Sequence, residues 1–121
     1  MRAHIFRHNE AGLTEMKAPE SLIVILRDRA ASADARDDAA MDLAAYDEPQ
    51  VQEALVAVGS DPSTPGTIAA SAGESLAEIW LRGDQFDPNA FVRLVGEARH
   101  EADALIRSRR RAWLESLTQA Y

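Results

Sequence analysis

The residues best suited to chemistry are a glutamate and a histidine spaced as metal ligands on a helix. Glu97-Ala98-Arg99-His100 has the E-x-x-H spacing that places a carboxylate and an imidazole on one helix face, as in di-iron bundles. That chemistry needs a second E-x-x-H and two further inward glutamates. The remaining histidines, His4 and His8, do not follow a glutamate at that spacing. We therefore predict no metal centre and interpret these side chains as solvated.

Motifs for nucleophilic catalysis and phosphate binding are missing from the sequence. The chain contains no cysteine, which excludes a thiol nucleophile, cysteine-ligated zinc and disulfide bridges. No serine lies in a G-x-S-x-G elbow, and no glycine-rich phosphate loop occurs. We expect a protein that is not an enzyme, with no catalytic residue and no cofactor. An unrecognised helical enzyme or metal-binding bundle is the alternative class.

Charge is unevenly distributed along the chain. Residues 34–61 contain eight acidic residues and one arginine, an imbalance equal to the net charge of -7 for the whole chain. Duplex-binding proteins normally carry the opposite sign, so the sequence argues against nucleic acid and for a basic protein as partner. Residues 104–112 contain four arginines and no acid. That segment suits a solvated helix end, but also contact with RNA, an acidic surface or the acidic segment of a second copy.

A single domain must position these side chains. The chain has 121 residues, of which 46% are hydrophobic, and this is enough to form one core. Its beginning has no apolar stretch of signal-peptide length, and its longest aliphatic run, residues 22–26, is too short to span a bilayer. We expect a cytoplasmic location without membrane attachment. We also expect an N-terminal arm over residues 1–18 and one domain over residues 19–121.

Helical periodicity extends from residue 19 to the C-terminus, and only residues 2–7 have any strand tendency. The prediction is an all-α domain of five to six helices, of which the last, from about residue 98, caps the end. Proline suits a first helical turn and aspartate suits a cap, so helices are expected to begin near Pro19, Asp34, Pro49, Pro65 and Pro88.

The same spacing identifies the apolar residues expected to form the core. Buried positions are predicted at Leu43, Leu55, Leu76, Ile79, Leu94 and Leu105. The inner stripe of the capping helix is expected to comprise Leu105, Ile106, Trp113 and Leu117.

Two parts of this pattern repeat. Leu43 and Leu76 are 33 residues apart, and each follows small residues and precedes an alanine. Glu48-Pro49 and Asp87-Pro88 each begin a helix whose apolar pair lies six and seven positions beyond the proline. Proline-led helices thus alternate with alanine-rich ones.

This alternation resembles the HEAT-like repeat family of helical hairpins. Residues 34–44 look like that family's first helix, with Arg36, paired alanines and Leu43 in typical places. The resemblance covers about residues 19–98 and implies a short right-handed stack of antiparallel hairpins, an α-solenoid. It also implies that second helices, here those beginning at Pro19, Pro49 and Pro88, line a concave face used for binding or scaffolding.

The acidic segment is the predicted binding surface, because its charge would steer a basic partner protein. Trp80 is interpreted either as part of a small aromatic core or as an anchor at an interface. The predicted binding residues are Asp37, Asp38, Asp42, Asp47, Glu48, Gln52, Glu53 and Trp80. A related alternative is an inhibitor or immunity-type protein that neutralises a basic toxin or nuclease. The oligomeric state is not predicted.

Overall fold

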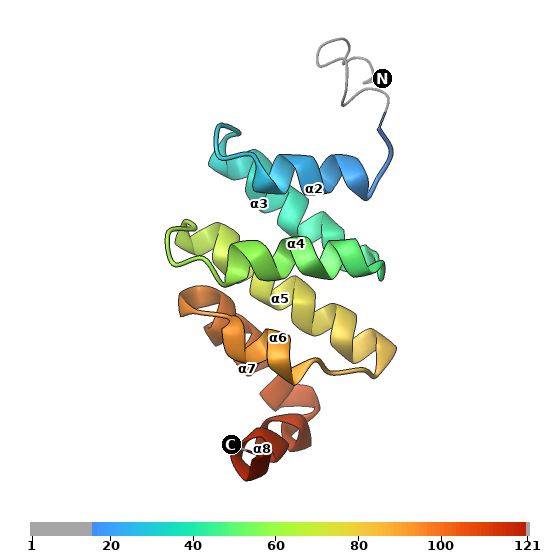
Figure 1. Cartoon of the computed structure of the whole chain (residues 1–121), viewed down its shortest axis with the longest axis vertical. Helices are drawn as coiled ribbons and strands as arrows, with labels where there is room; N and C mark the ends of the chain where they lie inside the picture. Colours follow the sequence, from blue (N-terminus) through green and yellow to red (C-terminus); the bar gives the residue numbers. More distant parts are fainter. Residues whose placement is uncertain (1–15, 121) are drawn as a thin grey trace.

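The computed structural model describes residues 16–120, and all regular structure in that range is helical (Figure 1). The elements are α2 (Glu20–Arg27), α3 (Ala33–Asp42), the 3-10 helix η1 (Leu43–Ala45), α4 (Pro49–Gly59), α5 (Gly66–Gly83), α6 (Pro88–Arg93), α7 (Gly96–Arg109) and α8 (Arg111–Ala120). The all-α prediction is confirmed for these residues. The strand tendency at residues 2–7 and most of the predicted N-terminal arm lie outside them.

The proline signals locate four helix starts closely. Pro49 and Pro88 occupy the first turns of α4 and α6, while Pro19 and Pro65 immediately precede α2 and α5. The expected cap at Asp34 is wrong. The cap of α3 is Ser32, whose hydroxyl accepts a hydrogen bond from the backbone N–H of Ala35 at 3.1 Å, and Asp34 falls in the first turn.

The described residues contain seven α-helices, not five to six, because the last helix expected from about residue 98 is divided at Arg110. Leu94 and Val95 are extended, which ends α6 at Arg93, and Gly96 then begins α7 with a φ of +52°. Arg110 has φ -141° and ψ 58°, which ends α7 and separates it from α8. The helix expected from residue 98 to the C-terminus is therefore two helices.

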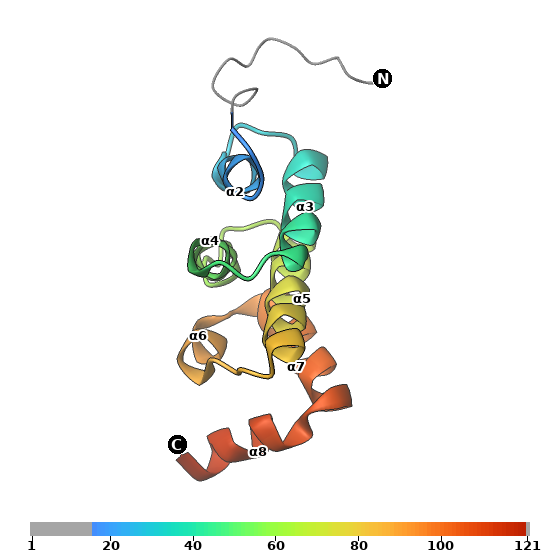
Figure 2. The same ribbon diagram turned by 90° about the vertical axis from the view of Figure 1, so that its right-hand side faces the viewer.

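The helices are arranged in two layers. Figure 2 shows α2, α4 and α6 in one layer and α3, α5 and α7 in the other, with α8 lying across the lower end. Within each layer the helices run in the same direction, and the two layers run in opposite directions (Figure 1). The close antiparallel pairs are α2–α3 and α4–α5, so the proline-led helix comes first in each pair. The repeat pattern had placed the alanine-rich helix first.

The core lies between the layers. Leu43, Leu55, Leu76, Ile79 and Leu94 are all at most 3% exposed, as predicted. The prediction for Leu105 is wrong. It is only half-buried because the inward stripe of α7 consists of Ala98, Ala102 and Ile106, spaced by four residues and each 0% exposed.

The break at Arg110 changes which face of α8 is buried. Of the stripe predicted for the capping helix, Ile106 is buried, whereas Leu105, Trp113 and Leu117 are partly buried against the core. Leu114, which was not predicted, is buried instead.

Helices α5 and α7 form the most extensive helix contact, and small residues allow it. A Cβ added at Gly73 of α5 would lie 2.0 Å from the carbonyl oxygen of Ala98 in α7. Gly59, at the end of α4, is also close to α7, with 3.2 Å between its added Cβ and that of Ala98. These two glycines set how closely the neighbouring helices approach.

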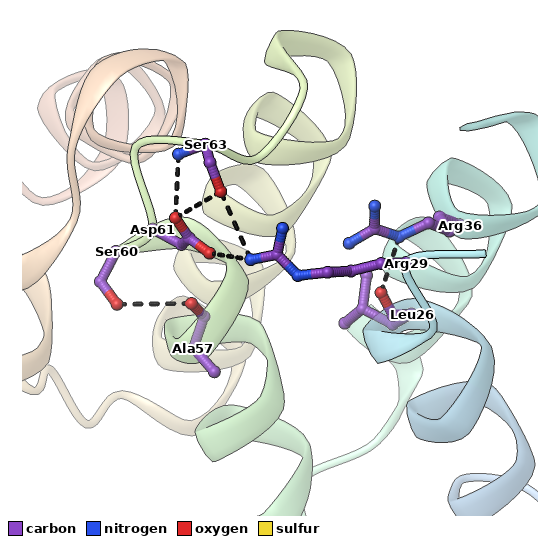
Figure 3. Close-up of polar contacts among 7 residues, drawn as sticks. All are labelled: Leu26, Arg29, Arg36, Ala57, Ser60, Asp61 and Ser63. Atoms are coloured by element: carbon purple, nitrogen blue, oxygen red, sulfur yellow. Dashed lines mark hydrogen bonds and ion pairs between the residues drawn. The ribbon is translucent and has the colours of Figure 1, made fainter. Parts of the chain in front are cut away.

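The turns that join the helix pairs are tied along one edge of the stack (Figure 3). Arg29, after α2, donates to the Asp61 carboxylate at 2.8 Å and to the Ser63 hydroxyl at 3.3 Å, both in the α4–α5 turn. In the other direction, the Val95 N–H, between α6 and α7, donates at 3.1 Å to the carbonyl of Gly59, the last residue of α4 before that turn. Three successive turns are therefore linked.

Helix α3 is joined to the end of α2 by a buried arginine. Arg36 is 8% exposed, and its Nε donates to the Leu26 carbonyl at 2.9 Å (Figure 3). The last carbonyls of a helix have no partner within the helix, so the guanidinium satisfies one of them.

We expect the contacts of Asp61 to make the folded domain less stable as the pH becomes acidic. Hydrogen bonds from the backbone N–H and hydroxyl of Ser63, and the charge of Arg29, lower the pKa of Asp61 below its ordinary value of 3.8. A lowered folded-state pKa stabilises the fold above the unfolded-state value, and this stabilisation is lost as the pH falls through the folded-state value. Asp61→Asn should reduce the loss of urea stability between pH 7 and about pH 3. The exposed Asp38→Asn is the control, and equal pH profiles for the two variants would contradict the assignment.

Candidate functional site

A groove between α4 and α6 includes four of the predicted binding residues, Asp47, Gln52, Glu53 and Trp80. It consists of two adjoining open pockets of about 500 and 440 Å³, which share Gln52 and Asp87. The first pocket is lined by Asp47, Gln52, Ile79, Trp80, Gly83, Gln85, Phe86, Asp87 and Pro88. The second is lined by Pro49, Gln52, Glu53, Val56, Ala57, Asp87, Ala90 and Arg93. We call the two together the α4–α6 groove.

Local sequence explains how its walls are placed. Residues 49, 52, 53 and 56 share one face of α4 because they follow helical spacing. At the end of α5, Asp84 adopts the left-handed conformation with φ 53°, which turns the chain back toward α4. Asp87 then caps α6, since its Oδ1 accepts from the Ala90 N–H at 3.0 Å. The cap fixes a carboxylate between the two pockets.

The base of the groove contains a hydrogen bond between two side chains. The indole Nε1 of Trp80 donates to Oε1 of Gln52 at 3.0 Å, and Trp80 is 2% exposed. Phe86 packs edge-on to Trp80, with 5.4 Å between ring centroids, and stacks on Trp113 of α8 at 5.1 Å. Trp80 thus belongs to the small aromatic core, and its part in the groove is to hold Gln52.

The lining is acidic. It includes three carboxylates, those of Asp47, Glu53 and Asp87, and one guanidinium, that of Arg93. Asp47 pairs with Arg82 at 2.5 Å, and Arg82 also donates to the Ala44 carbonyl at 2.7 Å. Glu53 is exposed and takes part in none of the salt bridges among the described residues. Its charge is available to a ligand.

The eight predicted binding residues do not form one surface. Asp47, Gln52, Glu53 and Trp80 come together in the groove, and Glu48 is exposed immediately before α4. Asp37, Asp38 and Asp42 lie on α3, in the other layer. Asp37 is partly buried and accepts a hydrogen bond from the Ser71 hydroxyl at 2.5 Å. The chain crosses between layers after η1, which divides the acidic segment.

Sequence reasoning missed the residues that α6 and its preceding turn contribute. Asp87, Phe86 and Arg93 line the groove but were not among the predicted binding residues. The sequence contained a signal for Asp87, because an acidic residue followed by proline starts both helices, as Glu48-Pro49 and as Asp87-Pro88. Equivalent helices of a repeat lie side by side, so Asp87 could have been placed next to α4.

Other candidate chemistry is dispersed. Glu97 and His100 are both exposed, and residues 16–120 contain no group of three or more acidic or histidine side chains placed to hold a metal. His4 and His8 lie outside the described residues.

In the arginine cluster, Arg107 forms two hydrogen bonds to Asp103 at 3.0 and 3.1 Å, which raise its pKa. Arg110 pairs with Asp84. Arg109 and Arg111 are exposed.

No protein-family model, curated protein or solved structure matches this chain. None of the helices between residues 16 and 120 has both the length and the apolar character required to cross a membrane.

Proposed function

We propose that this protein is a non-catalytic binding module of the HEAT-like repeat type, and that the α4–α6 groove receives a basic segment of a partner protein. The observation that carries the proposal is the groove itself, which combines apolar walls with three carboxylates. Apolar contact and opposite charge together are what a protein-binding surface offers.

The repeat assignment is supported by the two layers and by the equivalent positions of Leu43, in η1 directly after α3, and Leu76, in α5. Leu43 and Leu76, the two leucines 33 residues apart, are both 0% exposed. In such stacks one layer of helices forms an extended binding face. We assign that face to the layer of α2, α4 and α6 because it contains the groove, although α2 and α4 come first in their pairs. The proposed groove lies between two helices of this layer.

The mode of binding follows from the exposure of the charges. Glu48 and Glu53 are exposed, so they are well solvated and screened by salt over about 8 Å at physiological ionic strength. Charges of this kind accelerate encounter with an oppositely charged partner more than they slow its release. The groove should therefore act chiefly on the association rate.

Two charge-reversal variants with the same change in net charge test the location. Glu48→Lys/Glu53→Lys alters one groove residue and an exposed residue immediately before the same helix, and Asp38→Lys/Asp42→Lys alters exposed positions on α3. The partner is recovered by affinity capture with the wild-type protein and then measured in purified form by surface plasmon resonance. The groove variant should slow association by about tenfold at low salt, and the difference should shrink as salt rises. The α3 variant should change the association rate much less.

Equal effects of the two variants would show that net charge alone acts. A larger effect of the α3 variant would move the binding surface to the other layer. Circular dichroism and thermal melts of both variants serve as the folding control, because exposed substitutions usually change stability by less than about 0.5 kcal/mol.

A further inference from the structure

The orientation of the Gln52 side chain carries an inference about what the groove recognises. An indole N–H only donates, so the Gln52 atom that faces Trp80 must be the oxygen, and Nε2 takes the other position. No hydrogen bond from Nε2 occurs among the described residues, and Gln52 lines both pockets. Its two N–H groups are therefore available to a ligand in the groove.

The neighbouring groups restrict that ligand. Glu53 and Asp87 provide negative charge, while Val56 and Ala90 provide apolar contact. An anion would satisfy the Gln52 donors and the Arg93 guanidinium but would be repelled by the carboxylates, which outnumber that single cation. A simple cation would satisfy the carboxylates but has no acceptor for the amide. A peptide satisfies all of them, because each residue carries a carbonyl acceptor and its side chain can be basic or apolar.

The donors also indicate the conformation of the bound segment. Within a helix the backbone carbonyls are used by the helix itself, whereas an extended chain leaves them free. An extended chain also directs alternate side chains to opposite sides. Each wall offers an apolar residue and a carboxylate, Val56 and Glu53 in α4 and Ala90 and Asp87 at the start of α6. Side chains on either side of the extended chain therefore meet both kinds of group.

We infer that the α4–α6 groove binds an extended basic peptide segment whose main-chain carbonyl accepts a hydrogen bond from Nε2 of Gln52. Trp80 is a positioning residue, since its N–H holds the amide so that the donors face the ligand. This inference rests on the proposed function and specifies the chemistry of the same groove.

Gln52→Glu tests the inference because charge and hydrogen bonding predict opposite results. A glutamate at this position still accepts from Trp80, so the fold and its melting temperature should be kept. It removes both donors and adds a negative charge. Binding through charge alone would become tighter, whereas binding that needs the amide donors should weaken roughly three- to tenfold, the value of one hydrogen bond.

The probe is a capped synthetic peptide of alternating arginine and leucine residues, titrated into the isotopically labelled full chain and followed by NMR. We expect the side-chain amide resonances of Gln52 to shift, and the Gln52→Glu variant to bind more weakly than wild type. Equal or tighter binding by Gln52→Glu, or no shift of the amide resonances, would overturn the inference.

Two further variants separate this failure from failure of the proposed function. Glu48→Lys/Glu53→Lys should also weaken peptide binding. If it does so while Gln52→Glu does not, the acidic groove stands and only the amide contact is wrong. If the wild-type chain does not bind the peptide, or if neither variant changes its binding, both proposals fail. Trp80→Phe, which leaves Gln52 in place without its orienting N–H, should weaken binding less than Gln52→Glu.

Discussion

Gly73→Ala is expected to destabilise the domain by about 3 kcal/mol, the upper end of the usual cost of overpacking, although alanine is normally the better helix former by up to about 1 kcal/mol. The new methyl carbon would lie 2.0 Å from the carbonyl oxygen of Ala98 and 2.7 Å from its carbonyl carbon. Both atoms are backbone of a packed helix, so no side-chain rotation relieves the clash. Helices α5 and α7 must separate, and theirs is the most extensive contact in the fold.

The matched control is Gly83→Ala, at the last position of the same helix. A Cβ added there has no atom within 4 Å, so the substitution should be neutral or slightly stabilising. Urea unfolding of both variants measures the difference. A Gly73→Ala protein as stable as wild type would show that α5 and α7 do not approach this closely.

Leu76→Ala is expected to lower the free energy of unfolding by about 2 to 5 kcal/mol. Leu76 is 0% exposed and lies in the same helix between the two layers, so its removal leaves a cavity that rigid neighbours fill only in part. That loss is a large fraction of the stability of a typical domain, about 5–15 kcal/mol.

Met41→Ala is the control for Leu76→Ala, because Met41 also lies in a helix but is 48% exposed. Its unfolding free energy should remain within about 0.5 kcal/mol of wild type. If the two substitutions had similar costs, Leu76 would not occupy the packed core that its equivalence to Leu43 implies.

Four of the five prolines lie at or immediately before helix starts, because the ring fixes φ and removes an N–H that a first turn does not use. The errors occur where tertiary contacts decide the backbone. Leu94 and Val95 keep helical spacing in the sequence, yet they are extended, and the Val95 N–H is bonded to Gly59 in another helix. No proline or glycine in the sequence marks the helix break at Arg110. Its guanidinium instead pairs with Asp84 and lies 4.5 Å from the centre of the Trp113 ring.

The candidate site was predicted only in part, again because tertiary contacts decide which residues come together. Composition identified an acidic segment, and Gln52 and Glu53 do line the groove. The distribution of charge along the sequence does not reveal which layer a helix occupies. The prediction therefore grouped Asp38 and Asp42 with residues that lie in the other layer. The hydrogen bond from Trp80 to Gln52 joins residues 28 positions apart, a relation that only the packing of α4 on α5 creates.

The two walls of the groove have unequal support, and this has a consequence for local unfolding. Helix α4 packs against α2, α5, α6 and α7, whereas α6 has six residues and packs only lightly against α4 and α7. Segments with few buried contacts open at a lower free energy than the whole domain. We expect the α6 wall to detach transiently while α4 stays folded, at a cost set chiefly by exposing Phe91, which is 1% exposed in the folded domain. A ligand held by both walls would suppress this opening and protect the amides of α6 from hydrogen exchange.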